Sequence, residues 1–284
     1  MKLSKIFALL LALCLISSAA CAATFTDAHG NVIELDDSLE AYAAVTLVGA
    51  DNAARQGETN LGDLWADALR WFAVSGEINA AFDEDDVKAG NDRIAVDADH
   101  VVALWNGGNL RADIVEGTFG AEALAEVLPF PNKVAVVYMT GAQLLETLEA
   151  ASQGLPYTAE TADACASLMQ VSGLTYTVDT TKAYDALEAY GDHWFTAGSV
   201  SRVRIDDVNG QPFDAEATYA VVTSNANFNG MDSSYVLKAA AEANEQSAVT
   251  TAVVRDVVFR FIAAELNHQV GEAYAAPQGR LTIL

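Results

Sequence analysis

The chain has 284 residues, 52% hydrophobic and 19% charged, a composition typical of a globular protein and not of a disordered one. Acidic side chains outnumber basic ones 39 to 15, which gives a formal net charge of −24 at pH 7. A field of this sign repels nucleic acid and anionic membrane surfaces, so we expect no nucleic-acid partner. Any anionic ligand needs a locally basic pocket, and the few arginines therefore carry information.

The first 22 residues have the pattern of a secretory signal peptide. Lys2 and Lys5 precede an apolar run, residues 6–16, and small residues follow up to a cleavage pattern that ends at Ala22. The apolar run is too short to span a membrane. We therefore expect a mature chain that begins at Ala23, has no transmembrane span, and works in the periplasm or outside the cell.

The cysteines decide between simple cleavage and lipid attachment, and whether a disulfide can form. Lipid attachment at Cys21 is the less favoured alternative to simple cleavage, because Ser18 stands where a lipoprotein signal usually has a large aliphatic residue. Cleavage before residue 23 leaves Cys165 as the remaining cysteine, so no intramolecular disulfide can form. We expect a packing role for Cys165.

Residues 23–284 read as one domain with an N-terminal extension. The extension, about residues 23–48, holds two short β-like runs around His29-Gly30-Asn31, a pattern typical of a hairpin. We find no internal repeat, and no linker rich in Pro, Gly or Ser divides the rest of the chain.

A capped helix is predicted after residue 58. Thr59 or Asn60 is a suitable N-cap, and the apolar residues of 61–72 follow helical spacing. Arg55 precedes this N-terminus, where unpaired amides and the helix dipole already favour an anion. Glu58 is available as a local partner for Arg55 or as part of the cap, and a surface ion pair is the simpler interpretation.

A buried strand over residues 101–106 is followed by Asn-Gly-Gly-Asn-Leu-Arg. Gly107 and Gly108 have no Cβ, so the backbone can turn tightly there and approach a ligand. Arg111 then presents a planar group with five donors, which suits phosphate or carboxylate. The same order of strand, glycine turn and arginine also describes many ordinary hairpins, so the spacing alone leaves both interpretations open.

Other stretches give weaker signals. Residues 76–92, acidic at 83–86, are expected to form a solvated loop because they lack the ligand pattern of a calcium loop. Asp97, Asp99 and His100 are interpreted as the entrance to the strand at 101–106 and not as a metal site. The aromatic insertion 180–199 is expected to be a packed loop, with a lid as the alternative.

The remaining elements follow from hydrophobic periodicity and turn residues. We expect helices at 120–128, 144–151 (with a capping box at 140–143), 234–243 and 249–266, and strands at 133–139, 169–178 (with a bulge at Gly173), 200–208, 217–223 (joined to the preceding strand by an Asn209-Gly210 turn) and 280–284.

Read together, these segments resemble the C-terminal, substrate-binding domain of the 5'-nucleotidase family, from about residue 50 to the C-terminus. The resemblance rests on ordered motifs: Arg55-x-x-Glu58-Thr59-Asn60-Leu61-Gly62-Asp63-Leu64, Asn106-Gly107-Gly108-Asn109-Leu110-Arg111, Leu128-Pro129-Phe130-x-Asn132, Met139-Thr140-Gly141, Leu148-Glu149 and Gln170-Val171-Ser172-Gly173-Leu174. It implies an α+β fold, a layered α/β/β/α sandwich.

The resemblance also implies roles for residues at the phosphate and ribose end of a substrate. Arg111 matches the family arginine that grips phosphate, and Arg55 matches a second one less securely. Asn106 matches a polar contact near the ribose or the reaction centre, and Asp232 keeps the place of a ribose ligand. The substrate-binding set predicted here also includes Gly108.

At the base end the match is incomplete. Phe130 matches one of two aromatic residues that sandwich the base, and Asn132 matches a hydrogen-bonding neighbour of the base. Where the second aromatic is expected, six residues before Asp232, this chain has Ala226. Phe228 is the nearest substitute, and without it one stacking face is lost, at a cost of about 1 to 3 kcal/mol.

The family places its chemistry in a separate metallophosphoesterase domain, whose metal-binding motifs are not found here. The four histidines, His29, His100, His193 and His268, are scattered along the chain. We therefore expect no cofactor, no metal and no catalytic residue in this chain. Three hypotheses remain: a nucleotide, nucleoside or sugar-phosphate binding protein; the substrate-binding subunit of a split 5'-nucleotidase or UDP-sugar hydrolase with a separate metallophosphoesterase subunit; and a non-catalytic interaction domain with a decayed pocket.

Overall fold

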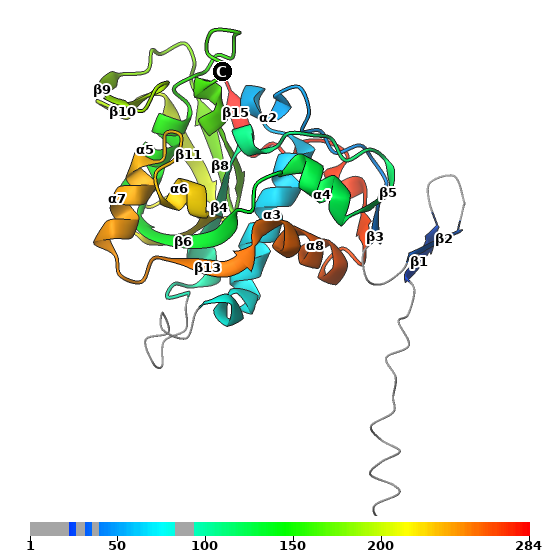
Figure 1. Cartoon of the computed structure of the whole chain (residues 1–284). Helices are drawn as coiled ribbons and strands as arrows, with labels where there is room; N and C mark the ends of the chain where they lie inside the picture. Colours follow the sequence, from blue (N-terminus) through cyan, green and yellow to red (C-terminus); the bar gives the residue numbers. More distant parts are fainter. Residues whose placement is uncertain (1–22, 27–31, 36–39, 83–93) are drawn as a thin grey trace, which may run out of the picture.

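A five-stranded sheet forms the centre of the computed structural model, which describes residues 23–26, 32–35, 40–82 and 94–284 (Figure 1). Its strand order is β13 (Ala248–Val253), β6 (Lys133–Thr140), β12 (Thr218–Ser224), β4 (Val101–Asn106) and β7 (Met169–Ser172). Only β12 and β4 run parallel; the other neighbours are antiparallel. The sheet is covered on both faces, which explains why β4 is apolar along its length and fully buried.

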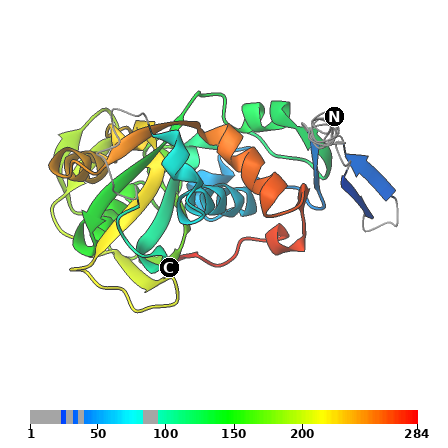
Figure 2. The same cartoon turned by 90° about the horizontal axis from the view of Figure 1, so that it is seen from below.

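One face of this sheet packs against helices α3 (Asn60–Val74) and α8 (Val254–Ala264), which lie side by side (Figure 2). The N-cap prediction for α3 is confirmed, because Thr59 Oγ1 accepts a hydrogen bond from the Gly62 amide at 3.0 Å. Trp65 of α3 meets Trp105 of β4 in this core, with ring centroids 6.1 Å apart.

The other face packs against a second sheet, of order β11 (Val203–Val208), β8 (Leu174–Val178) and β15 (Leu281–Ile283). Helices α5 (Gly141–Ala151) and α7 (Tyr235–Ala243) complete this second core. The predicted capping box of α5 is present between Thr140 and Gln143. These layers confirm the predicted α+β sandwich.

Smaller elements surround the layers. A third sheet has the order β14 (Gln269–Val270), β3 (Glu40–Ala43) and β5 (Gly117–Gly120), and the hairpins are β1 (Ala23–Thr26) with β2 (Val32–Leu35) and β9 (Ala186–Tyr190) with β10 (Trp194–Ala197). The short α-helices are α2 (Ala53–Gln56), α4 (Ala121–Val127) and α6 (Asn225–Phe228), and 3-10 turns occur at Glu77–Ala81, Ala98–His100, Gly107–Asn109, Ala164–Ser167 and Glu272–Tyr274. No helix within these described residues is long and apolar enough to cross a membrane.

Four sequence predictions of local structure are wrong in detail. Gly173, at φ +80°, is not a bulge within one strand, because β7 and β8 on either side of it belong to different sheets. Likewise, residues 203–208 and 218–224 do not pair across the Asn209-Gly210 turn, since β11 and β12 lie in different sheets. Residues 248–253 form a strand before α8 begins. The start of the expected loop at 76–92 is a 3-10 turn with Ile78 buried, and residues 83–93 lie outside the described part.

The C-terminal segment is tied to α3 and to the residue 58 region before it by three acidic side chains. Glu58 accepts from the amides of Arg280 and Leu281, each at 3.0 Å. The Arg280 guanidinium donates to Asp67 Oδ2 at 2.8 Å and lies 3.8 Å from Asp63 Oδ1. Glu58 therefore serves neither as the partner of Arg55 nor as a helix cap; it fixes the strand β15.

Asp63 gives this network a pH dependence. Burial raises the pKa of Asp63 from its ordinary value of 3.8 to about 8, Arg280 opposes the shift and Glu58 adds to it. Between about pH 4 and pH 8 the folded state holds a proton that the unfolded state has lost, so this group makes stability fall as pH rises, by at most about 1.4 kcal/mol per pH unit. Denaturant unfolding of wild type and Asp63→Asn at pH 5 to 8 should show a flatter profile for the variant. Parallel profiles would contradict this assignment.

Candidate functional site

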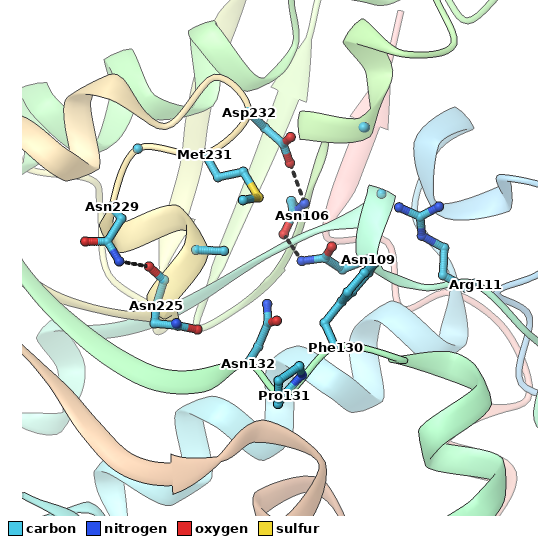
Figure 3. A pocket seen from close by; sticks show the side chains of 14 residues that line it. Asn106, Asn109, Arg111, Phe130, Pro131, Asn132, Asn225, Asn229, Met231 and Asp232 are labelled. Carbon is cyan, nitrogen blue, oxygen red and sulfur yellow. Dashed lines mark hydrogen bonds between the residues drawn. The ribbon is translucent and has the colours of Figure 1, made fainter. Parts of the chain in front are cut away.

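A cavity of about 620 Å³ opens at the carboxyl end of β4, a size suited to a small-molecule ligand. Its walls come from residues 106–111 after β4, residues 130–132 before β6, residues 225–232 of α6 and the following loop, and Ala166 (Figure 3). The fold thus brings together three segments that are far apart in the sequence. Six of the seven residues predicted to bind substrate line this cavity: Asn106, Gly108, Arg111, Phe130, Asn132 and Asp232.

A chain of polar side chains crosses the floor of the cavity. Asn106 Nδ2 donates to Asp232 Oδ2 at 2.7 Å, and Asn109 Nδ2 donates to Asn106 Oδ1 at 2.8 Å (Figure 3). Burial raises the pKa of Asp232, while Arg55, the Asn106 hydrogen bond and Arg111 oppose that shift. Asp232 has a left-handed backbone, φ 56°, which turns the loop at this point. The arrangement offers a carboxylate and amides as partners for ligand hydroxyl groups.

Arg111 lies at one end of the cavity against Phe130. The guanidinium carbon is 5.7 Å from the ring centroid, a cation–π distance. Burial and the neighbouring Arg55 lower the pKa of Arg111, and Asp232 opposes the shift. Among the residues that the structure describes, Arg111 forms no ion pair, so its donors are available to an anion. Phe130 is 41% exposed and contributes apolar surface to the same cavity.

Arg55 stands behind the cavity and does not line it. Its Nη1 donates to the Ala162 carbonyl at 2.9 Å and lies 3.7 Å from Asp163 Oδ1. Its charge still reaches the site, since it contributes to the pKa shifts of Arg111 and Asp232. Arg55 therefore acts on the cavity through its charge and not by direct contact. Of the two arginines, only Arg111 faces the cavity.

Gly107 and Gly108 allow neighbouring segments of the protein to pack closely, more than they allow the backbone to approach a ligand. A Cβ on Gly107 would clash with the backbone of Ala54, and one on Gly108 would lie 2.6 Å from the Ala166 Cβ. The close approach that we expected toward a ligand is thus made toward α2 and the segment around Ala166. Gly108 nevertheless contributes to the cavity wall.

The wall that should carry a second aromatic is built differently. Phe228 packs against the second core and is absent from the described cavity lining, so it does not substitute for the missing ring. Met231, 59% exposed, lines the cavity instead, with Asn225 and Asn229 of the preceding helix. Sequence analysis missed these three residues and Asn109, although the alternating Asn-Ala-Asn-Phe-Asn run at 225–229 is a visible signal.

Across the described ranges, no group of three or more His, Cys, Asp or Glu side chains could hold a metal ion. Asp97, Asp99 and His100 lead into β4, with residues 98–100 in a 3-10 turn, in line with a strand entrance.

Comparisons with known proteins agree with this geometry. The family model of the 5'-nucleotidase C-terminal domain matches residues 40–239. The trifunctional nucleotide phosphoesterase protein YfkN of Bacillus subtilis is 28% identical over 188 residues, which cover 65% of this chain and 10% of that protein. A 5'-nucleotidase precursor from Thermus thermophilus is 28% identical, with a TM-score of 0.61 over 86% of this chain and 39% of its own.

A more distant structure shares the fold. The NAD nucleotidase of Haemophilus influenzae is 16% identical, with a TM-score of 0.56 over 86% of this chain and 38% of its own. The chain thus spans well under half the length of each of these relatives. Since the family model covers most of the chain, and the Thermus structure shares its fold, the chain belongs to the family of 5'-nucleotidase C-terminal domains.

Proposed function

We propose that this chain binds nucleotides and nucleosides in the cavity at the end of β4, and that it does so outside the cytoplasm. The observation that carries the proposal is the convergence of Arg111, Phe130 and Asp232 on one cavity of about 620 Å³. These are a cation, an aromatic face and a carboxylate, the three groups that a nucleoside phosphate needs. The relatives described above, nucleotidases and a nucleotide phosphoesterase, favour the same class of ligand.

Each part of the ligand has a partner in this arrangement. The Arg111 fork pairs with two phosphate oxygens, in a molecule whose net charge of −24 otherwise repels anions. Phe130 stacks on the base. Asp232 accepts hydrogen bonds from ribose hydroxyls and Asn106 donates to them. Asn132 forms a hydrogen bond with the edge of the base.

Calorimetric titration of the purified chain in metal-free buffer tests the proposal. We expect AMP to bind with micromolar or tighter Kd, and adenosine to bind more weakly because it lacks the phosphate that Arg111 pairs with. Absence of heat with both ligands, at high concentration and at two temperatures, would refute nucleotide binding and favour an interaction domain with a decayed pocket.

A second candidate is the substrate-binding part of a two-chain phosphoesterase. It is favoured by the Thermus 5'-nucleotidase precursor, in which the matching region is 39% of a longer chain. In that case a separate metallophosphoesterase subunit supplies the metals and the water-activating groups. Release of phosphate from AMP when such a subunit is added, and not with either chain alone, would support this candidate; no release with any metallophosphoesterase of the same cell would dismiss it.

A further inference from the structure

The hairpin β9–β10 is placed where it can control the cavity. It forms a two-stranded sheet of its own, and most of β9 is exposed (Figure 1). An isolated hairpin is marginally stable in water, so its position depends on the contacts that it makes with the rest of the fold. Along β10, the Phe195 amide donates to Gln153 Oε1 at 2.8 Å and the Ala197 amide to Tyr235 Oη at 2.9 Å.

The turn end of the hairpin touches one wall of the cavity through Tyr190. Tyr190 Oη donates to the Gly230 carbonyl at 2.6 Å, two residues before Asp232. The contact is close enough that a Cβ on Gly230 would clash with this hydroxyl, and Gly230 has φ +86°, a backbone conformation suited to glycine. The Tyr190 ring also packs on Tyr235, with centroids 5.6 Å apart. Tyr190 therefore fixes the start of the loop that carries Met231 and Asp232.

The same turn also touches, through Trp194, the segment that carries Ala166 of the cavity wall. Trp194 Nε1 donates to the Ala164 carbonyl at 3.2 Å, and His193 Nε2 lies 3.8 Å from Asp163 Oδ2. The segment 162–166 holds Arg55 through the Ala162 carbonyl and Asp163, and its Ala166 lines the cavity. Trp194 therefore contacts the segment beside Arg55 that forms part of the cavity wall.

We infer that the β9–β10 hairpin is a brace across the cavity, and that Tyr190 and Trp194 are positioning residues for it. Tyr190 sets the wall that meets ligand hydroxyls through Asp232, and Trp194 sets the wall at Ala166, beside Arg55. The ligand part of this inference rests on the proposed nucleotide binding; the bracing itself does not. Under this inference the insertion at residues 180–199 acts as a strut between two loops, and not as a lid or an ordinary packed loop.

Two conservative variants test the brace. Tyr190→Phe removes one hydroxyl, and we expect the Kd values of AMP and adenosine to rise about 3- to 10-fold while displacement by inorganic phosphate is unchanged. Trp194→Phe removes one donor, and we expect a rise of similar size for AMP and inorganic phosphate but not for adenosine. Tyr184→Phe is the matched control, because its hydroxyl bonds to Phe195 within the same insertion, at 2.8 Å, and touches neither wall; its Kd values should equal those of wild type.

A ligand-free measurement separates the brace from the proposed function. Hydrogen–deuterium exchange of amides 230–234 should be faster in Tyr190→Phe than in wild type and Tyr184→Phe. Unchanged exchange would overturn the brace whatever the ligand. An equal loss of affinity for AMP, adenosine and inorganic phosphate in both Tyr190→Phe and Trp194→Phe would also overturn the brace, since that result indicates general loosening of the fold. Faster exchange in a protein that binds no AMP would retain the brace and refute the proposed function.

Discussion

We expect replacement of Arg111 by alanine to raise the Kd for AMP about 10- to 100-fold. Arg111 faces the cavity, forms no ion pair among the described residues and packs on Phe130. A charge-assisted bond to phosphate in such a site contributes about 1.5 to 3 kcal/mol. Arg55 does not replace it, because it is held by Ala162 and Asp163 and does not line the cavity. Calorimetry with AMP and adenosine measures the effect.

The controls separate phosphate recognition from general damage. Adenosine should bind Arg111→Ala nearly as well as it binds wild type, apart from any loosening of Phe130. Arg111→Lys should give an intermediate Kd, because lysine keeps the charge and loses the two-pronged geometry. Arg204→Ala, at a side chain 75% exposed on β11, should bind AMP like wild type. An Arg111→Ala protein with unaltered AMP affinity would remove this arginine from the proposed site.

We expect Glu149→Ala to lower the free energy of unfolding by about 3 to 5 kcal/mol. Glu149 lies fully buried on α5, and its carboxylate accepts from the Arg202 amide, at 2.9 and 3.2 Å, and from the Val203 amide, at 2.8 Å. The Arg202 guanidinium is also buried and donates to the carbonyls of Ser152 and Leu155, and the charge of Glu149 stabilises it. Alanine leaves two buried amides without an acceptor and removes a negative charge that stabilises this buried cation.

Urea unfolding monitored by circular dichroism measures this loss. Glu126→Ala, at an exposed position of α4, is the matched control and should change the free energy by less than about 0.5 kcal/mol. Glu149→Gln keeps one acceptor oxygen and should fall between the two. Equal unfolding free energies for Glu149→Ala and Glu126→Ala would contradict the structural role of this carboxylate.

The elements that depend on neighbours in the sequence were predictable. Thr59 caps α3 and Thr140 with Gln143 caps α5, because each interaction spans three residues and needs no distant partner. The buried strand at residues 101–106 follows from an unbroken apolar run. The resemblance then pointed to residues that the structure gathers around one cavity, although they lie up to 126 positions apart, as Asn106 and Asp232 do.

The partners of individual side chains were decided only by the tertiary structure. Glu58 was interpreted as a local partner for Arg55 or as part of the helix cap, yet it binds the backbone of Arg280 and Leu281. Arg55 binds Ala162 and Asp163 instead. Gly173 separates two sheets, which no local pattern distinguishes from a bulge. By itself the sequence determined the longer helices, the caps of α3 and α5 and the central strand, since short-range contacts and apolar periodicity act within a few residues. The motifs of the resemblance added six of the cavity residues. Strand order, the hairpin brace and the choice of ion-pair partners depend on contacts between segments more than 100 residues apart in several cases, and those exist only once the layers have packed.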